Sequence, residues 1–521
     1  GRDEELNLLL SRWQHAKEGE GQVVLLSGEP GIGKSRLVEA LRERVSDERC
    51  TRIRYQCSPY HASSALYPAI SQLEHAAGFA PNDTPDQKLD KLEALLAVST
   101  PHVAEVAPLI GTLLAIPTGG RYPPLDLPPA QFRERTLNAL VEQLLGLSAQ
   151  GPVLFVMEDA HWIDPTTQDL IGLMIDRIQH APVLVVITFR PEYVPPWGHH
   201  PHVTSLTLSR LGRQESGVIV QHLLGGNPLP AGVLEQIVDK TDGVPLFVEE
   251  LTKTVIESDL MREREQGYDL SGPLPPFAIP STLQDSLMAR LDRLAPVREV
   301  AQVGAVIGRE FAFDLLAAVI QLSDNRLHDA LEQLVQSGLV LRRGSSSQPT
   351  FAFKHALVQD TAYTTLLRSR RQQLHGRIAL VLQERFPDRV AVEPEILARH
   401  FQEAGFSDRA AEYWERAGRR AIQRAANLEA ISHLQQALAA LRSLPQTPER
   451  DAKEVDLLTA LGIPLIAARG YTAPEVLETY QTARATCERL GEPARLFPVL
   501  WGLWTTYRAR LDMRTARKIA H

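Results

Sequence analysis

The sequence is poor in cysteine, and its few cysteines form no pattern. Its 521 residues include only three, Cys50, Cys57 and Cys487, and their spacing indicates neither disulfide pairs nor a metal site. Few cysteines without pairing are typical of a reducing compartment, so the sequence predicts a cytoplasmic protein.

Long hydrophobic runs and an excess of positive charge are also missing. No apolar run approaches the roughly 18 residues that a transmembrane helix needs, and no signal-peptide pattern is present. The formal net charge is −8, from 63 acidic and 55 basic residues. This balance disfavours nucleic acid as a partner of this segment, and the hydrophobic pattern predicts no membrane partner.

The length exceeds what one hydrophobic core accommodates, so three or four domains are expected in 521 residues. The chain opens with Gly-Arg-Asp and stops inside a helical pattern, which indicates a segment of a longer protein.

Short apolar runs alternate with helical patterns in the N-terminal part. This alternation predicts an α/β domain with a parallel five-stranded sheet covered on both faces, and the phosphate-loop pattern of "GEPGIGKS" at residues 28–35 makes this a P-loop NTPase fold. The expected strands are residues 23–27, 51–57, 153–157, 183–188 and 203–208. The expected domain is residues 1–208, with a helical insertion at about residues 58–150.

Three further domains follow in the predicted organisation. Residues 209–275 form an all-α helical domain, closed by the Gly/Pro-rich linker "SGPLPPFAIP" at 271–280. Residues 281–385 form a winged helix, because "GLVLRRGSSSQPTFAFKHALV" sets two short strands around a Gly-Ser turn after three helices. Residues 393–521 form a truncated α-solenoid of tetratricopeptide (TPR)-like repeats, in which Ala410 and Ala417 recur as Ala430 and Ala437.

The segment "GEPGIGKS" fits the phosphate-loop pattern at every fixed position. Its glycines let backbone N–H groups turn toward phosphates at the positive end of the next helix. Lys34 is expected to reach the β- and γ-phosphates and Ser35 to ligate Mg²⁺. A strand before the motif and a helix after it disfavour a chance glycine-rich turn. The expected nucleotide contacts are Gly28, Pro30, Gly31, Ile32, Gly33, Lys34, Ser35 and Arg36.

Such a site also needs a carboxylate at the end of a neighbouring strand. The segment "PVLFVMEDAHWIDP" supplies Glu158 and Asp159 at the edge where parallel sheets bind ligands. Both are candidate Mg²⁺ ligands and, with Lys34, candidate catalytic residues. His161, which follows, suits a phosphate or water contact and a structural contact equally well.

The next strand ends in "VVITFRPE", which sets Thr188 and Arg190 beside the γ-phosphate, with Arg190 as a catalytic or sensing residue. Two later residues stay open from local sequence alone. Pro245 suits an adenine contact or an ordinary first-turn position. His355 suits a diphosphate contact or a structural role.

Together these motifs resemble the STAND class of P-loop ATPases, signal-transduction relatives of the AAA+ proteins. "GRDEEL" resembles the entry motif that lies near the adenine in that class, which makes Arg2 a candidate contact. "DGVPLFVEEL" and "FKHALV" resemble its Gly-x-Pro motif and nucleotide-sensing histidine, which favours contacts by Pro245 and His355. The choice of ATP or ADP over a guanine nucleotide rests on this resemblance.

Phrases such as "RYQCSPYH" and "FKHALVQDTAY" are most similar to the ATPase and repeat region of bacterial class III adenylate/guanylate cyclase fusion proteins. Large regulators of the LuxR type resemble the ATPase more loosely. Relatives often carry two aspartates where this chain has Glu158 and Asp159. By position Glu158 joins the Mg²⁺ shell and Asp159 orients water, whereas by chemistry the reverse assignment is equally open.

The resemblance implies a slow ATPase that serves as a switch. A peptide, protein or small ligand binds the repeats, ATP promotes self-association, and an effector domain in the same full-length chain responds. That effector is expected to be a nucleotide cyclase, although no cyclase motif occurs in this segment. Two alternatives remain: a remodelling AAA+-like ATPase with multiple turnovers, and a binding module with a decayed site, which intact Lys34 and Ser35 disfavour. The basic run at 368–377 suits a solvated helix face better than a nucleic-acid contact.

Overall fold

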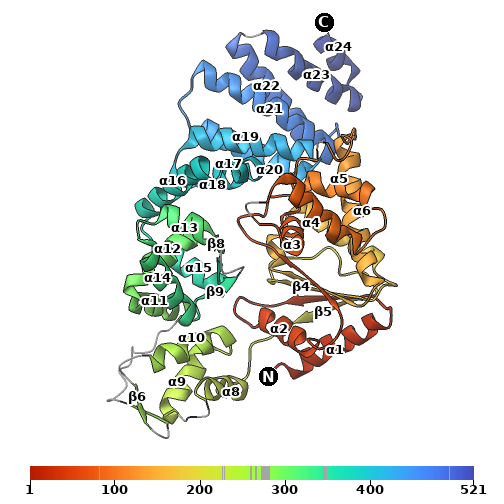
Figure 1. Ribbon diagram of the computed structural model, residues 1–521. Coiled ribbons are helices and arrows are strands. Elements are labelled where there is room, and N and C mark those ends of the chain that lie inside the picture. Colours follow the sequence, from red (N-terminus) through yellow and green to blue (C-terminus); the bar gives the residue numbers. More distant parts are fainter. Residues whose placement is uncertain are drawn as a thin grey trace. The chain divides into compact units, whose positions relative to one another are not determined.

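The computed structural model describes residues 1–80, 83–118, 120–225, 227, 229–257, 261–264, 267–270, 282–343, 349–491 and 493–520 (Figure 1). The chain forms two compact units. The first comprises Gly1–Arg52, Leu154–His161 and Pro182–Leu374. The second comprises Ile53–Val153, Trp162–Ala181 and His375–His521.

A parallel five-stranded sheet organises the N-terminal part, in the spatial order β2-β3-β4-β1-β5. Its strands are β1 (Gln22–Ser27), β2 (Thr51–Gln56), β3 (Val153–Glu158), β4 (Val183–Phe189) and β5 (Val203–Thr207). Each predicted strand is confirmed to within one residue at either end. One detail was wrong: β4 lies between β1 and β3, so the strand that ends at Glu158 is not the direct neighbour of the strand before the phosphate loop.

Burial explains why these runs form strands. Nearly every residue of β1, β3 and β4 is buried, whereas the edge strands β2 and β5 are half-exposed. Helices α1 (Asp3–Lys17) and α2 (Lys34–Arg44) pack onto this sheet. The apolar face of α2 is buried, since Leu37, Val38 and Leu41 are buried, as is Val45 directly after the helix.

The remainder of the first unit is mainly helical (Figure 1). Its helices are α8 (Arg213–Leu223), α9 (Ala231–Thr241), α10 (Pro245–Ile256), α11 (Leu283–Arg293), α12 (Ala295–Ile307), α13 (Phe313–Val319), α14 (Asp324–Gln336) and α15 (Ala356–Thr364). Helix α16 (Arg368–Arg385) follows.

Two small antiparallel sheets also occur in this part of the chain. Strands β8 (Glu310–Ala312), β9 (Val340–Arg343) and β10 (Thr350–Phe353) form a sheet in the order β8-β10-β9. The pair β6 (Met261–Arg264) and β7 (Gly267–Leu270) was not expected, because few strands were predicted after residue 208. The linker at 271–280 and the Gly-Ser turn at 344–348 lie outside the described residues. The winged-helix interpretation and the domain boundaries stay predictions.

In the second unit, the helices of the insertion are α3 (Tyr67–Ala77), α4 (Pro85–Ala97), α5 (Val103–Leu113) and α6 (Pro129–Ser148). Helix α7 (Pro165–Arg177) connects β3 to β4 along the chain, after a short 3₁₀ turn η1 (Ala160–Trp162). The insertion therefore belongs to the same compact unit as the repeat region, and not to the unit that contains the phosphate loop.

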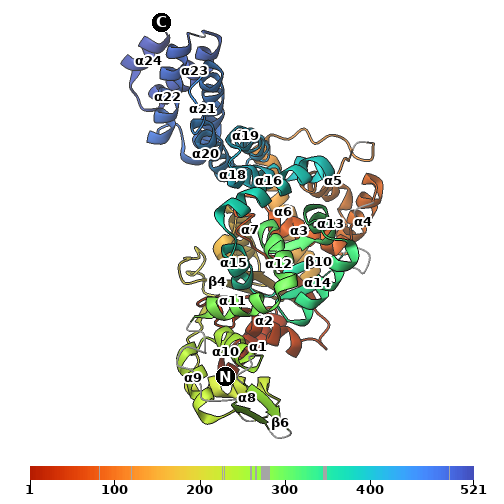
Figure 2. The same ribbon diagram turned by 90° about the vertical axis from the view of Figure 1, so that its left-hand side faces the viewer.

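The repeat region is a row of helices in which each packs on the next (Figure 2, blue). They are α17 (Pro387–Val392), α18 (Pro394–Ala404), α19 (Ser407–Gln423), α20 (Asn427–Arg442), α21 (Pro448–Arg469), α22 (Pro474–Leu490), α23 (Pro493–Ala509) and α24 (Met513–Ala520). The four recurring alanines of α19 and α20 are all buried, as the repeat pattern predicts. Among the described residues, every helix is too short or too polar to cross a membrane.

Close packing in the repeats generates a first prediction. The ring of Tyr480 on α22 lies against Gly462 of α21 and Gly502 of α23. A Cβ at Gly502 would approach Tyr480 Cε1 to 2.3 Å, which no real packing allows. We expect Gly502→Ala to destabilise this region by about 1–3 kcal/mol, because the ring or a helix must shift. Thermal unfolding followed by circular dichroism measures the loss.

The matched control is Gly217→Ala on α8, where a Cβ would meet nothing within 4 Å. Alanine there should leave the unfolding midpoint unchanged or raise it slightly, since alanine favours the helix. Equal midpoints for Gly502→Ala and the parent protein would contradict the described packing.

Candidate functional site

The glycine-rich loop between β1 and α2 wraps around a lysine ammonium. Gly31 and Gly33 have φ angles of +78° and +104°, a region that favours glycine. Lys34 is only 8% exposed, and its Nζ donates hydrogen bonds to the carbonyl oxygens of Gly28 at 2.6 Å and Glu29 at 3.0 Å. Burial lowers the pKa of Lys34 to about 8, against the opposing charge of Asp159. At neutral pH the loop therefore presents a cation.

The acidic pair takes two different positions at the end of β3. Glu158 is 6% exposed, and its Oε2 lies 3.4 Å from Ser35 Oγ at the start of α2. Asp159 has a φ of +58°, so the chain turns sharply directly after the strand. The Asp159 N–H donates to Thr188 Oγ1 at 3.1 Å, so Thr188 on β4 supports this turn. The Ser35 hydroxyl and the Glu158 carboxylate thus meet at the sheet edge, and both are oxygen ligands of the kind that hard metal ions prefer.

A cavity lies over the loop and opens to solvent; with that open space included, it measures about 820 Å³. Eleven predicted site residues line it: Pro30, Gly31, Ile32, Gly33, Lys34, Ser35, Arg36, Asp159, Arg190, Pro245 and His355. Four others do not line it: Arg2, Gly28, Glu158 and Thr188. Arg2 instead donates to the carbonyl oxygen of Ile32 at 3.4 Å, and to that of Ser209. In this structure Arg2 therefore contacts the phosphate loop from outside the cavity.

Helix α10 begins directly on the phosphate loop. Pro245 is its first residue, and the next backbone N–H, of Leu246, donates to the carbonyl oxygen of Gly31 at 3.2 Å. A Cβ at Gly31 would lie 3.1 Å from Leu246 Cβ, so the close approach also favours glycine there. Pro245 and Leu246 give the cavity an apolar wall, which Ala356 and Leu357 extend.

Sequence reasoning missed Arg309, which precedes β8. Its guanidinium forms an ion pair with Asp159 Oδ2 and lines the cavity. The two residues are 150 positions apart, and no motif or spacing marks Arg309. Arg309 thus brings a positive charge from a distant part of the chain to Asp159.

His355 also reaches the cavity wall. It directly precedes α15, and its buried Nε2 has no hydrogen-bond partner in the described part of the chain. Burial lowers the pKa of His355 to about 4, and the charge of Lys354 contributes in the same direction. A neutral imidazole with an unsatisfied nitrogen is therefore available to a bound group.

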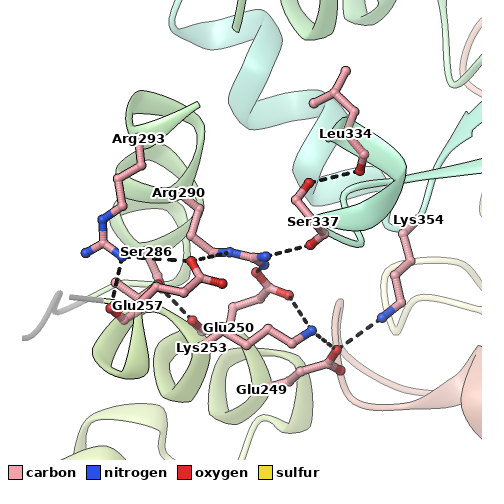
Figure 3. A network of polar contacts seen from close by, with 11 residues as sticks. Glu249, Glu250, Lys253, Glu257, Ser286, Arg290, Arg293, Leu334, Ser337 and Lys354 are labelled. Carbon is pink, nitrogen blue, oxygen red and sulfur yellow. Dashed lines mark hydrogen bonds and ion pairs between the residues drawn. The ribbon is translucent and has the colours of Figure 1, made fainter. Parts of the chain in front are cut away.

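A network of polar contacts extends from the cavity wall into the helices behind it (Figure 3). Glu249 accepts from Lys253 at 2.5 Å and from Lys354 at 3.1 Å. Burial opposes its ionisation, but these two hydrogen bonds lower the pKa of Glu249 to about 2. Next to it, Glu250 forms a buried ion pair with Arg290, whose Nη2 donates to the carbonyl oxygen of Ser337 at 2.6 Å (Figure 3). The middle of α10 is thus anchored to α11 and to the residue that follows α14.

These residues fit a nucleoside polyphosphate with Mg²⁺. Five cationic side chains line the cavity, and their charge suits the phosphates: Lys34, Arg36, Arg190, Arg309 and Lys354. Ser35 and Glu158 supply the oxygen ligands that Mg²⁺ prefers. The orphaned imidazole nitrogen and the apolar wall suit a diphosphate and a flat base, respectively.

Comparisons with known sequences agree with this geometry. Residues 1–186 match the family described as the AAA ATPase domain. An uncharacterized protein of Rhizobium meliloti (strain 1021) is 31% identical over 518 residues, which cover 97% of this chain and 49% of that protein. Hybrid signal transduction histidine kinase G of Dictyostelium discoideum is 26% identical over 185 residues, 34% of this chain and 5% of that protein. The chain therefore spans about half, or less, of the length of these relatives.

Two solved structures show weaker likenesses. A signal transduction ATPase with numerous domains (STAND) from Pyrococcus horikoshii, with a tetratricopeptide repeat sensor, is 12% identical with a TM-score of 0.43, over 100% of this chain and 76% of that chain. Drosophila ORC bound to DNA is 12% identical with a TM-score of 0.30, over 70% of this chain and 87% of that chain. Likenesses of this size carry no functional conclusion. The sequence match at residues 1–186 and the phosphate loop on a parallel five-stranded sheet instead support an AAA-type P-loop ATPase domain in the N-terminal part of the chain.

Proposed function

We propose that this chain is the nucleotide-binding and sensing part of a STAND-class switch, which holds ADP or ATP with Mg²⁺ and controls an effector domain. One observation carries the proposal: a distant segment closes over the phosphate loop, with Arg309 paired to Asp159 and His355 in the cavity wall. Such a closure restrains the acidic pair, which suits a protein that must stay in one state until a signal arrives.

Six of the predicted site residues have distinct roles in this proposal. Lys34 and Arg190 bind phosphates, Pro245 contacts the adenine, and His355 donates or accepts a hydrogen bond at a diphosphate. Ser35 and Glu158 hold Mg²⁺, because their oxygens already lie 3.4 Å apart. When bound, Mg²⁺ neutralises phosphate charge and polarises the terminal phosphoryl group.

Asp159 is then left to orient the attacking water. While Arg309 holds its Oδ2, this carboxylate is a poor acceptor for the proton of water. Hydrolysis is therefore slow, and it resets the switch once it has occurred. A shift from mostly off to mostly on needs about 5 kcal/mol of differential binding. A γ-phosphate that draws Arg309 and Arg190 toward itself supplies part of this, and a ligand on the repeats supplies the rest.

The remaining steps concern partners. A peptide, protein or small ligand on the TPR-like repeats favours nucleotide exchange, and the ATP-bound chain self-associates in the cytoplasm. The effector lies elsewhere in the full-length protein, since this chain spans 49% of its Rhizobium meliloti relative. A nucleotide cyclase is the proposed effector, and the DNA-binding output of a LuxR-type regulator is the alternative.

A second candidate is a remodelling ATPase with multiple turnovers. The match of residues 1–186 to the AAA ATPase domain favours this kind of function. The Arg309–Asp159 ion pair weighs against it, because an enzyme that cycles rapidly needs its acidic pair available for each turnover.

The nucleotide content of the purified protein tests the proposal directly. We expect the purified segment to be a monomer. On denaturation it should release stoichiometric ADP, which chromatography identifies. Lys34→Ala should carry none, because it removes the cation that the loop encloses. An empty protein that turns ATP over rapidly would support the remodelling enzyme instead, and an empty, inactive one would support a binding module.

Removal of the closing ion pair should accelerate exchange. We expect Arg309→Gln to release a bound fluorescent ADP analogue roughly tenfold faster, within the usual range of coupling energies. Arg298→Gln is the matched control, since Arg298 pairs with Asp292 at 2.6 Å on the surface and does not line the cavity. Identical release rates for Arg309→Gln and the parent protein would show that the pair does not restrain the nucleotide.

The pKa of Lys34 predicts a pH dependence of binding. In the empty protein the Lys34 ammonium is charged below its pKa of about 8. Bound phosphates stabilise this protonated form and so raise the pKa of Lys34. Nucleotide affinity should therefore be fully present below pH 8 and fall by up to about tenfold per unit above it. Equilibrium titration at a series of pH values measures the slope. Lys34→Arg should give a flat profile, and a parallel fall in both proteins would exclude Lys34 as the titrating group.

A further inference from the structure

One segment of the chain lies on the repeat helices in the way that a bound peptide would. Residues 59–65 lie between β2 and α3 in the second unit, and they contact α18, α19 and α20. Their sequence is Pro-Tyr-His-Ala-Ser-Ser-Ala. No residue from 55 to 73 is Asp, Glu, Lys or Arg, although such residues make up 23% of the whole chain. The segment is therefore an uncharged stretch that offers backbone groups, hydroxyls and aromatic rings.

Helix α18 contacts both ends of the segment. Arg399 Nη1 donates to the carbonyl oxygen of Pro59 at 3.0 Å, and its guanidinium carbon lies 4.1 Å from the ring centroid of Tyr60. Four residues after Tyr60, the hydroxyl of Ser64 donates to Glu395 Oε1 at 2.6 Å. Arg399 and Glu395 are one turn apart on α18, so one face of this helix contacts a carbonyl group, an aromatic ring and a hydroxyl.

Helices α19 and α20 complete the surface. His433 on α20 is 3% exposed and makes a hydrogen bond to the backbone of Ser63. The methyl group of Ala65 packs on a cluster of buried alanines at the junction of the two helices: Ala421, Ala426 and Ala430. The segment is thus held through its backbone and through a few side chains. Main-chain hydrogen bonds for affinity and side-chain contacts for specificity are the usual means of peptide recognition.

The charges on the repeat side of this contact offset one another. A cavity lies between the segment and the repeat helices; with the space open to solvent included, it measures about 490 Å³. The charge of Arg420 is offset by Glu395 and Glu393, and that of Arg424 by Glu395. Three carboxylates and two guanidinium groups line this cavity: Glu393, Glu395, Glu429, Arg420 and Arg424. A surface of mixed charge that is paired within itself suits an uncharged ligand that forms hydrogen bonds.

The contact carries costs that make it replaceable. Burial raises the pKa of Glu395 and lowers that of His433 to about 4, so the removal of both groups from water is unfavourable. Leu66, which directly follows the segment, has a φ of +60°, a region that favours glycine. Because hydrogen bonds to such buried groups contribute only a small net free energy, a second peptide with the same groups can compete for them.

We propose that α18, α19 and α20 form a peptide-binding surface, which residues 59–65 occupy as an internal ligand. The partner is an uncharged peptide segment that presents an aromatic ring, a hydroxyl four residues later and a small side chain directly after the hydroxyl. Arg399 binds the ring and the carbonyl oxygen before it, and Glu395 accepts from the hydroxyl. The partner displaces residues 59–65. That this displacement is the signal for the switch rests on the proposed function above, whereas the peptide-binding surface itself does not.

Displacement of the segment changes the contacts at the start of α7. The Leu66 N–H donates to Asp164 Oδ1 at 3.1 Å, and Asp164 caps α7. In the first turn of α7, the Thr166 N–H donates to Glu429 Oε1 of α20 at 2.8 Å. The segment, the repeats and α7 therefore meet at one place. Since α7 begins only a few residues after Asp159, the loss of the Leu66 hydrogen bond acts close in sequence to the acidic pair.

Fluorescence anisotropy with the whole chain and a labelled peptide of residues 58–66, SPYHASSAL, tests the surface. In the parent protein the internal segment competes at an effective concentration on the order of millimolar, so the peptide binds weakly. Tyr60→Ala with Ser64→Ala removes two contacts of the internal segment and should bind the peptide at least about fivefold more tightly.

The matched control is Ser71→Ala with Tyr471→Ala, two exposed positions outside the segment. This variant should bind the peptide as weakly as the parent protein does. Equal affinity of the two double variants would overturn the proposal. If Tyr60→Ala with Ser64→Ala does not fold, Ser64→Ala alone decides the matter: it should bind the peptide about two- to threefold more tightly than the parent, and an unchanged affinity would contradict the proposal.

The required chemistry of the partner is tested in the Tyr60→Ala, Ser64→Ala background. The peptide SPAHASAAL, which lacks the aromatic ring and the second hydroxyl, should bind at least about tenfold more weakly than SPYHASSAL. Arg399→Gln should weaken the binding of SPYHASSAL by a similar factor, whereas Arg416→Gln, an exposed position on α19, should not. Equal binding of the two peptides, or no binding of SPYHASSAL with a Kd below about 1 mM, would overturn the proposal.

The release rate of a fluorescent ADP analogue, measured with and without SPYHASSAL in the same background, tests the coupling. Faster release with the peptide supports a signalling role, and an unchanged rate contradicts that role. Peptide binding by a chain that holds no nucleotide would contradict the proposed function and leave the peptide-binding surface standing. Nucleotide binding without peptide binding would contradict only this inference.

Discussion

The contact between the phosphate loop and the first turn of α10 is the constraint on which the cavity depends. The Leu246 N–H donates to the Gly31 carbonyl oxygen, and the absence of a side chain at Gly31 allows that approach. The other side of α10 is fixed by the buried pair of Glu250 and Arg290, since either partner alone would be a costly buried charge. The shape of the loop and the position of the helices behind it are therefore set together.

The charges around the cavity follow the same logic. Several cations of the cavity have a partner from the protein: Lys34 has loop carbonyls, Arg309 has Asp159, and Lys354 has Glu249. A polyphosphate that enters must compete with these partners. In the proposed switch, three phosphates would compete for these cations more strongly than two, so the γ-phosphate would shift their pairing further than a diphosphate does.

Sequence patterns were sufficient for the sheet and the loop, because both depend on neighbouring residues. Continuous apolar runs located the five strands, and the loop motif located Lys34 and Ser35. They could not order the strands in space, so β4 was not expected between β1 and β3. They also missed Arg309, Glu249 and Lys354, since the approach of such distant residues depends on tertiary packing. The strands β6 and β7 carry charged and mixed residues without apolar alternation, so no local signal announced them.

The helical insertion makes physical sense only together with the repeats. A P-loop sheet needs a connection from β2 to β3, but not one of four helices. Here the segment before α3 bonds to the repeat helices, through Ser64 to Glu395 and through the Pro59 carbonyl oxygen to Arg399 at 3.0 Å. The N-terminus of α7 is held in the same unit by Glu429 and by its own cap, Asp164, whose pKa burial raises to about 7. Helix α7 begins only a few residues after the acidic pair. The hydrogen bond from Thr166 to Glu429 therefore joins the repeats to a segment that is close in sequence to the residues that a nucleotide would contact.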